Sequence, residues 1–377
     1  MKKRILFLMP DLPSGGAEKV LIDILRNFDY NVYDVTLLLE YRQGVYLKDI
    51  PSAVRFKTMF GASNIWLERW HRLLSILHCG HLYHSIVHKL VLLFTLRGLK
   101  FDTIVSFMEG EAVRLHSYIM DKATNNVSWV HIDLKTKHWS QVFFKNNEQE
   151  LGAYKRMDKV VFVSEEARTR FLELFDIDAY KCLVQYNIID SAIIRNLAVS
   201  KEVKKEKPTV CMVGRLNSQK RYDRALRVVK RLKDDGLDFV LWILGEGELK
   251  QEIEMLIVEY GLEDVVLLKG FVSPSYPLIA QADLLLSTSD SEGFSLVVAE
   301  AFCLGIPVVS TKTAGPVELI GNSEYGILVD NDISSISIAV NRLLTDRELR
   351  EYYSKKSLER SKRFQVDATM EQIYSIL

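Results

Sequence analysis

The stretch that decides the fold is residues 5–28, ILFLMPDLPSGGAEKVLIDILRNF. The apolar run Ile5–Met9 predicts a buried strand, and the apolar spacing of the second half predicts a helix with one buried face. Gly15 and Gly16 lie in the turn between them. Such a turn lets the backbone approach a ligand and points the first helical amides at an anion. This turn lacks the GxGxxG pattern of dinucleotide-binding proteins. A tight strand-to-helix turn that binds no ligand would contain the same two glycines.

The same alternation of strand and helix continues on both sides of residues 191–207, where charged residues crowd. It predicts an α/β fold with two Rossmann-like, doubly wound domains that face each other across a cleft. We expect a first domain at 1–190, a linker at 191–207 and a second domain at 208–362, with a last helix at about 363–377 packed back on the first domain. The expected strands are residues 5–9, 35–39, 103–107, 128–130, 159–163 and 182–185, then 210–213, 239–244, 265–268, 284–287, 308–310 and 326–329.

Composition excludes several classes of protein. The 377 residues are 48% hydrophobic and 26% charged, which is typical of a globular chain. Lys and Arg total 49, as do Asp and Glu, so no net charge favours nucleic acid. No apolar run approaches the ~20 residues that cross a bilayer. The four cysteines have no paired spacing, which favours a reducing cytoplasm.

Two later stretches carry candidate ligand-binding residues. Gly214, Arg215 and Lys220 follow an expected strand, and two cations at such a point suit a diphosphate, although they could equally form surface ion pairs. In SDSEGFSLVVAEA, Glu292 and Glu300 flank a helix start whose free amides could hold an anion. The alternative is that Glu292 only complements the helix dipole and that Glu300 lies on a solvated face.

The motifs of this sequence, in their order along the chain, resemble those of the retaining glycosyltransferases of family 4 (GT4), which have the two-domain GT-B fold. The resemblance covers nearly the whole chain. It rests on Ser14-Gly15-Gly16-Ala17-Glu18, Trp129-Val130-His131, Val163-Ser164-Glu165-Glu166, Gly214-Arg215-Leu216 with Lys220, Leu244-Gly245-Glu246-Gly247, Glu292-Gly293-Phe294 with Glu300, and Gly305-Ile306-Pro307-Val308.

The resemblance implies that the domain at 1–190 is the acceptor side and that the domain at 208–362 binds the nucleotide sugar. It also implies a role for each matching residue. Arg215 and Lys220 would hold the donor diphosphate, Glu300 the ribose diol and Glu292 the donor sugar, with His131 near the transferred sugar. The implied catalytic residues are Glu292, His131, Arg215 and Lys220. The implied donor-binding residues are Gly16, Gly214, Arg215, Lys220, Gly293, Phe294, Ser295, Leu296 and Glu300.

The implied activity is retaining, metal-independent transfer of a sugar (EC 2.4) from a nucleotide diphosphate sugar, which we expect to be a UDP-sugar. The expected acceptor is a lipid-linked glycan in capsule or other cell-surface polysaccharide synthesis. One alternative is an epimerase or phosphorylase of the same fold, although we identify no cofactor-bearing lysine. Another is a catalytically inactive partner or scaffold subunit, which the intact set of site residues argues against.

We expect no cofactor and no metal site. The triplets Asp176-Ile-Asp178 and Asp330-Asn-Asp332 lie where turns and helix caps are expected, and the histidines between 71 and 88 have no carboxylate among them.

Residues 61–100 carry five Lys or Arg, one acidic residue, Glu68, and two tryptophans, Trp66 and Trp70. This composition suits peripheral contact with an anionic membrane, and we expect the protein at the cytoplasmic face of the cell membrane. The alternative is a set of amphipathic helices packed on the first domain.

Overall fold

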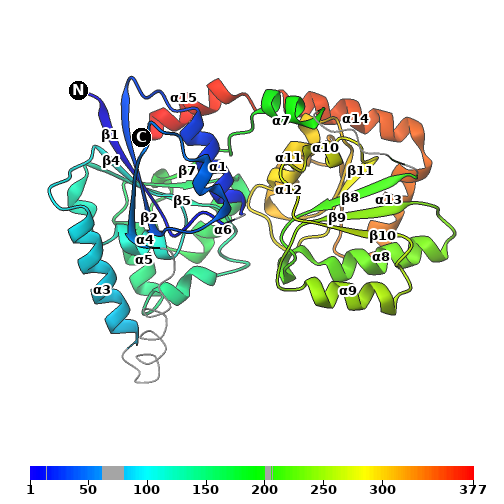
Figure 1. The fold of residues 1–377 in the computed structure, drawn as a ribbon, viewed down its shortest axis with the longest axis horizontal. Coiled ribbons are helices and arrows are strands. Elements are labelled where there is room, and N and C mark those ends of the chain that lie inside the picture. The colour runs from blue at the N-terminus through cyan, green and yellow to red at the C-terminus, as the bar shows by residue number, and fades with distance from the viewer. Residues whose placement is uncertain (14, 62–79, 200–204, 206) are drawn as a thin grey trace. The chain divides into compact units, whose positions relative to one another are not determined.

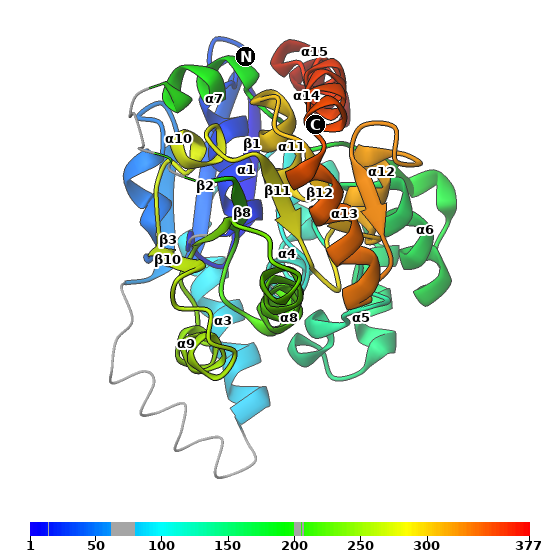
Figure 2. The same cartoon turned by 90° about the vertical axis from the view of Figure 1, so that its right-hand side faces the viewer.

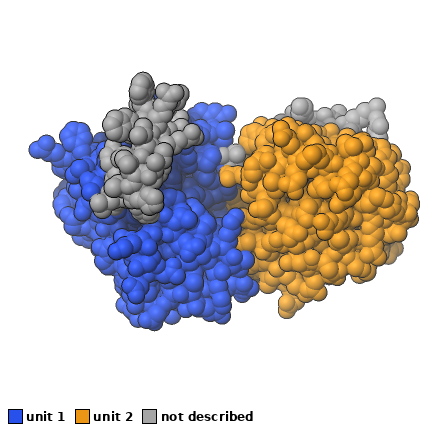
Figure 3. Space-filling model, turned by 90° about the horizontal axis from the view of Figure 1, so that it is seen from below, with its two compact units in different colours: residues 1–188, 367–377 blue, residues 189–366 orange. Residues whose placement is uncertain are grey.

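The computed structural model describes residues 1–13, 15–61, 80–199, 205 and 207–377. The chain forms two compact units, shown in different colours in Figure 3. Unit 1 comprises Met1–Ile188 together with Asp367–Leu377, and unit 2 comprises Ile189–Val366.

Unit 1 is built on a parallel seven-stranded sheet in the order β3-β2-β1-β4-β5-β6-β7. The strand order reverses between β1 and β4, and ligands of such sheets bind at the carboxyl ends of the strands beside this point. The strands are β1 (Lys3–Met9), β2 (Tyr33–Tyr41), β3 (Arg55–Phe60), β4 (Thr103–Ser106), β5 (Asn125–Val130), β6 (Lys159–Phe162) and β7 (Cys182–Val184).

The helices of unit 1 connect these strands (Figure 1). The first helix forms as predicted, because its apolar residues Val20, Leu21, Ile24 and Leu25 are all buried. The helices are α1 (Gly16–Arg26), η1 (Val45–Asp49), α3 (Gly80–Thr95), α4 (Glu111–His116), η2 (Met120–Lys122), η3 (Trp139–Phe143), α5 (Asn147–Lys155), α6 (Glu165–Leu174) and η4 (Ala179–Lys181).

Unit 2 holds a parallel six-stranded sheet in the order β10-β9-β8-β11-β12-β13. All six strands of this half match expected strands. They are β8 (Thr209–Val213), β9 (Val240–Leu244), β10 (Val266–Gly270), β11 (Leu284–Ser287), β12 (Val308–Thr311) and β13 (Ile327–Val329). The helices are α7 (Ser191–Ala198), η5 (Ser218–Lys220), α8 (Tyr222–Asp234), α9 (Lys250–Glu259), α10 (Tyr276–Ile279), α11 (Leu296–Cys303), α12 (Ala314–Ile320), α13 (Ile333–Thr345) and α14 (Arg347–Ser361).

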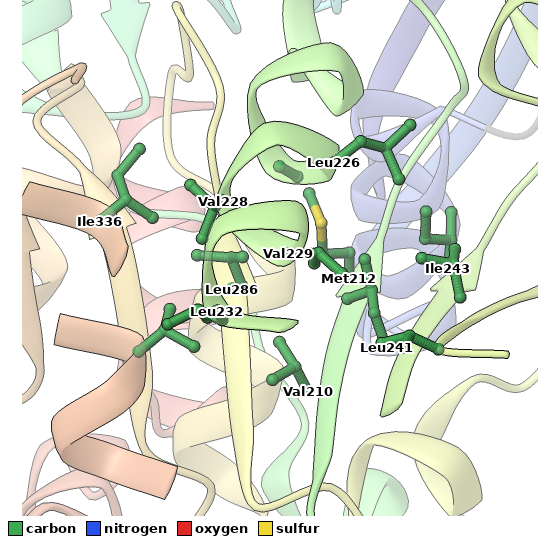
Figure 4. Close-up of a cluster of buried hydrophobic side chains, with 14 of the residues drawn as sticks. Val210, Met212, Leu226, Val228, Val229, Leu232, Leu241, Ile243, Leu286 and Ile336 are labelled. Carbon is green, nitrogen blue, oxygen red and sulfur yellow. The ribbon is translucent and has the colours of Figure 1, made fainter. Parts of the chain in front are cut away.

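Helices cover both faces of this second sheet, with α8 and α9 on one face and α10 and α11 on the other (Figures 1 and 2). The core under α8 is drawn in Figure 4, where Val210 and Met212 of β8 and Leu241 of β9 meet Leu226 and Leu232 of the helix. Each of these side chains is at most 3% exposed. Full burial of such a side chain contributes about 1.5–3 kcal/mol, so this packing stabilises β8 and β9 against α8.

The last helix, α15 (Val366–Ile376), packs on unit 1 (Figure 1). The Tyr374 ring stacks on Tyr33 at a centroid distance of 4.9 Å and meets the edge of Phe28 at 5.5 Å. Lys159 Nζ donates to the carbonyl of Ile376 at 2.6 Å. The helix starts at Val366, close to the predicted start at about 363.

The expected linker at 191–207 is partly a helix. Residues 191–198 form α7, whose Ile194 and Ala198 are buried. Arg195 Nε donates to the carbonyl of Cys303 on α11 at 2.9 Å, so α7 is tied to unit 2. The prediction was wrong for residues 191–198, because it extended the charged, solvated character of the residues after 200 to the whole segment.

Edge strand β3 was not predicted from the sequence, since its residues are all at least partly exposed and carry no apolar run.

Within the described ranges, no helix is long and apolar enough to cross a membrane.

Candidate functional site

In unit 2 the predicted lysine lies at the carboxyl end of β8. The strand ends at Val213, and Gly214 begins the turn that leads to η5 and Lys220. A Cβ on Gly214 would lie 2.9 Å from Lys220 Cε, so a larger residue there would displace the end of the lysine side chain from its present position. Lys220 Nζ lies 2.6 Å from Glu292 Oε1. The structure therefore brings together two residues that the sequence predicted as parts of one site.

Glu292 is held by more than this ion pair. Ser289 Oγ donates to Glu292 Oε1 at 2.7 Å, and the backbone amide of Gly315 donates to the Glu292 carbonyl at 3.1 Å. A Cβ on Gly315 would lie 2.3 Å from the backbone carbon of Phe294, so the α12 start and this loop can approach only with glycine there. Glu292 is 8% exposed, and its orientation is set before any ligand binds.

A network of charges fixes the two loops to each other. Arg221 has a left-handed backbone, with φ of 53°, and its guanidinium binds both Asp223 and Asp290, the latter at 2.8 Å. Arg224 Nη2 also donates to Asp290, at 2.7 Å. Gln219 Nε2 donates to the carbonyl of Ser291 at 2.7 Å. None of these side chains was predicted as a site residue, because the contacts to Asp290 and Ser291 join positions that are far apart in the sequence.

The expected helix start after Gly293 is present as α11. Ser295, at its N-cap, has a left-handed backbone with φ of 66°. Glu300 is 5% exposed within this helix, so the alternative that it lies on a solvated face is wrong. Arg215, in contrast, has an exposed side chain. A small pocket lies at the ends of β8 and β11 and is lined by Met212, Val213, Lys220, Tyr222, Leu286, Ser287, Thr288, Ser289, Ser295 and Val297.

In unit 1, His131 follows β5 at the carboxyl edge of the sheet. Its ring lies 4.8 Å from that of Phe107, centroid to centroid. Neither ring nitrogen forms a well-aligned hydrogen bond within the described residues. Burial lowers the pKa of His131 to about 3, and the backbone of Phe107 opposes this shift only in part. The imidazole is therefore neutral at physiological pH, with one nitrogen that can donate and one that can accept a hydrogen bond, and both nitrogens are buried.

Glu109, which sequence analysis did not single out, holds the backbone of His131. Its Oε2 accepts the His131 amide at 3.0 Å, and its Oε1 accepts the indole N–H of Trp139 at 3.1 Å. Glu109 is 2% exposed. A signal was present in the sequence, since Glu109 lies in the loop after the buried strand β4, and such loops of a parallel sheet form its ligand-binding edge.

Gly16 is the first residue of α1, and Gly15 is its N-cap. A Cβ on Gly15 would lie 2.0 Å from Oε2 of Glu18, which is 5% exposed. The start of the helix therefore already faces a carboxylate, which makes it less suited to a phosphate. Ser14 lies outside the described residues, and the role of Gly16 stays a prediction.

In the part of the chain that the structure describes, no three His, Cys, Asp or Glu side chains are grouped as they would be around a metal ion. Of the two aspartate triplets, the second has a clear structural role: Asp332 caps α13 by accepting the amide of Ser335 at 2.8 Å.

Comparison with known proteins gives a consistent result. Residues 194–360 match the model of the family described as glycosyl transferases group 1. The chain is 34% identical over 234 residues to the N-acetylgalactosamine-N,N'-diacetylbacillosaminyl-diphospho-undecaprenol 4-alpha-N-acetylgalactosaminyltransferase of Campylobacter jejuni, an alignment that covers 60% of this chain and 63% of the relative. It is 27% identical over its full length to an uncharacterized glycosyltransferase of Haemophilus influenzae.

Among solved structures, that of Anabaena HepE in complex with UDP-glucose aligns with a TM-score of 0.76 and 22% identity, over 99% of this chain and 98% of that one. Together with the two parallel sheets, this likeness confirms the GT-B fold that the motifs implied. The match to the glycosyl transferases group 1 family spans residues 194–360, all of which lie in unit 2.

Proposed function

We propose that this protein is a retaining glycosyltransferase that moves a sugar from a UDP-sugar to a lipid-linked glycan in bacterial cell-surface polysaccharide synthesis. The observation that carries the proposal is the Lys220–Glu292 pair beside a pocket at the strand ends of unit 2, within the part of the chain that matches the family. The Campylobacter relative, by its name, acts on a diphospho-undecaprenol-linked glycan, which supports the acceptor class.

The chemistry of the site fits departure of a nucleotide diphosphate. Lys220 and Arg215 would neutralise the charge that develops on the diphosphate as the bond to the sugar breaks, the role a metal takes in other transferases. The buried carboxylate of Glu300 would accept hydrogen bonds from the ribose, and Glu292 would accept them from the donor sugar. Neutral His131 would donate to a sugar hydroxyl, and the leaving phosphate would take the acceptor proton.

The proposal is tested by incubating the protein with UDP-, GDP- and ADP-sugars in the presence of EDTA. Free nucleotide diphosphate and the thermal midpoint are measured for each. We expect slow release of UDP from one UDP-sugar and stabilisation by UDP alone. Release that requires added Mg²⁺ would contradict the metal-independent mechanism. Neither binding nor release with any donor would favour the scaffold alternative.

We propose further that α3 lies on an anionic membrane surface. Ile86, Leu90 and Phe94 lie on one face of α3 and are 51%, 61% and 76% exposed. Lys89 and Arg97 lie nearby, and residues 86–100 contain no acidic residue. An exposed apolar face with basic neighbours is typical of a helix in the headgroup region. Trp66, Trp70, Arg69 and Arg72, which also carried this prediction, lie outside the described residues.

The membrane proposal predicts that the protein floats with vesicles that contain phosphatidylglycerol and not with vesicles of phosphatidylcholine alone. The triple variant I86E/L90E/F94E is expected to lose most of this binding, since each buried apolar side chain contributes roughly 1.5–3 kcal/mol. The matched control is M255E/V258E on α9, whose replaced side chains are 65% and 64% exposed. Equal flotation of the triple variant and the wild type would disprove the role of α3.

A further inference from the structure

Glu109 joins three segments of unit 1 at the carboxyl edge of the sheet. It lies between β4 and α4, and it binds the backbone of His131 after β5 and the indole of Trp139 in η3. The next residue, Gly110, has φ of 77°, and a Cβ there would lie 2.9 Å from the Phe143 ring, so the turn packs closely under η3. The segment from His131 to Trp139 is thus held at both ends by one side chain.

The two hydrogen bonds require a carboxylate. Both groups that face Glu109 are N–H donors, one on each oxygen, so both oxygens must be acceptors. A glutamine can offer one acceptor only, and its NH₂ would face a second N–H. A protonated carboxyl is also a poorer partner, because its hydroxyl oxygen accepts a hydrogen bond more weakly than a carboxylate oxygen does. Burial of two opposed donors without an acceptor is costly.

We propose that ionised Glu109 is a positioning residue for sugar transfer, which fixes the His131–Trp139 segment so that the His131 ring meets the donor sugar. This inference rests on the proposed function. Glu109 itself does not touch substrate; it acts through the backbone of His131, while Phe107, two residues before it, packs on the ring of that histidine.

The surroundings of Glu109 predict a pH dependence. Burial raises the pKa of Glu109 above 4.5 and the charge of Glu150 adds to this, while the amide of His131 and the indole of Trp139 oppose it. Activity that needs the ionised form is therefore lost, as the pH falls, at a pH above that of an ordinary glutamate. The titratable or charged groups around Glu109 are His131, Glu150 and Tyr154 on α5, His138, which pairs with Glu150, and Glu111 and Arg114 on α4.

Because several of these groups titrate, the test compares variants in which only the match between donors and acceptors changes. Turnover and KM are measured as a function of pH for the wild type, E109Q, W139F and E109Q/W139F. We expect E109Q to lower kcat on the order of tenfold to a hundredfold, the cost of a misplaced group, with the donor KM little changed. In W139F the indole donor is gone, so the NH₂ group of a glutamine at position 109 no longer faces an N–H group. We therefore expect E109Q to change kcat by less than about twofold in the W139F background.

The acid limb of the wild-type pH profile is expected to vanish in E109Q/W139F. A second readout does not depend on activity: the indole N–H resonance of Trp139, identified by its loss in W139F, should shift over the same pH range. If E109Q does not fold, the double variant and this resonance still decide the question. An E109Q protein with wild-type kcat and pH profile, or an indole resonance that does not shift with pH, would overturn the inference. If the wild type transfers no sugar, the proposed function is overturned. The pairing of Glu109 with Trp139 is still tested in that case, because the indole resonance is measured without enzyme activity.

Discussion

Replacing Lys220 with alanine is expected to slow release of nucleotide diphosphate from the accepted donor by about 10²- to 10³-fold, the usual cost of removing one group that stabilises transition-state charge. Lys220 lines the pocket of unit 2, and its Nζ is 2.6 Å from Glu292 Oε1. Its side chain is 22% exposed, so the ammonium is partly solvated and available to a phosphate. The measurement is kcat and KM for the donor that the wild type uses.

The control for this prediction is K230A on α8, which removes a lysine that pairs with Asp234 on the surface. It should leave turnover unchanged, because exposed pairs contribute little. Circular dichroism of both variants shows whether they fold. A folded K220A protein with turnover within about twofold of the wild type would show that Lys220 does not stabilise the leaving diphosphate.

Glu292→Gln is expected to change binding and turnover in opposite directions. Without a ligand, the negative charge of Glu292 neutralises Lys220, and Ser289 holds the same oxygen. Gln keeps the size of the side chain but removes the charge, so Lys220 should bind UDP more tightly, on the order of tenfold or about 1.4 kcal/mol. Sugar transfer should fall about 10²-fold, because a charged acceptor for the donor sugar is lost.

Calorimetric titration with UDP and the rate of UDP release measure the two effects separately. E359Q, which breaks the Lys356–Glu359 pair at 3.1 Å on α14, is the matched control and should change neither. Weaker UDP binding by E292Q would indicate that the carboxylate orients Lys220 for the phosphate and does not compete with it.

Much of unit 2 was predictable from the sequence. Each of its strands is an apolar run bounded by turn residues, and the functional loops follow β8 and β11 directly. Local spacing also placed Glu292 before a helix and Glu300 within it. In unit 1 the edge strand β3 escaped prediction, since an edge strand of mixed polarity lacks the apolar pattern of a buried parallel strand.

The sequence by itself determined the alternation of strands and helices, the two-domain fold and the glycine turns that follow the strands, because these follow from hydrophobic periodicity and from residue types at short spacing. Only the tertiary structure decided which side chains meet. Lys220 and Glu292 are 72 positions apart, and Glu109 and Trp139 are 30 apart, yet each pair forms a hydrogen bond. Such contacts are set by strand order, which brings distant strand ends to one edge of a sheet and has no local pattern in the sequence.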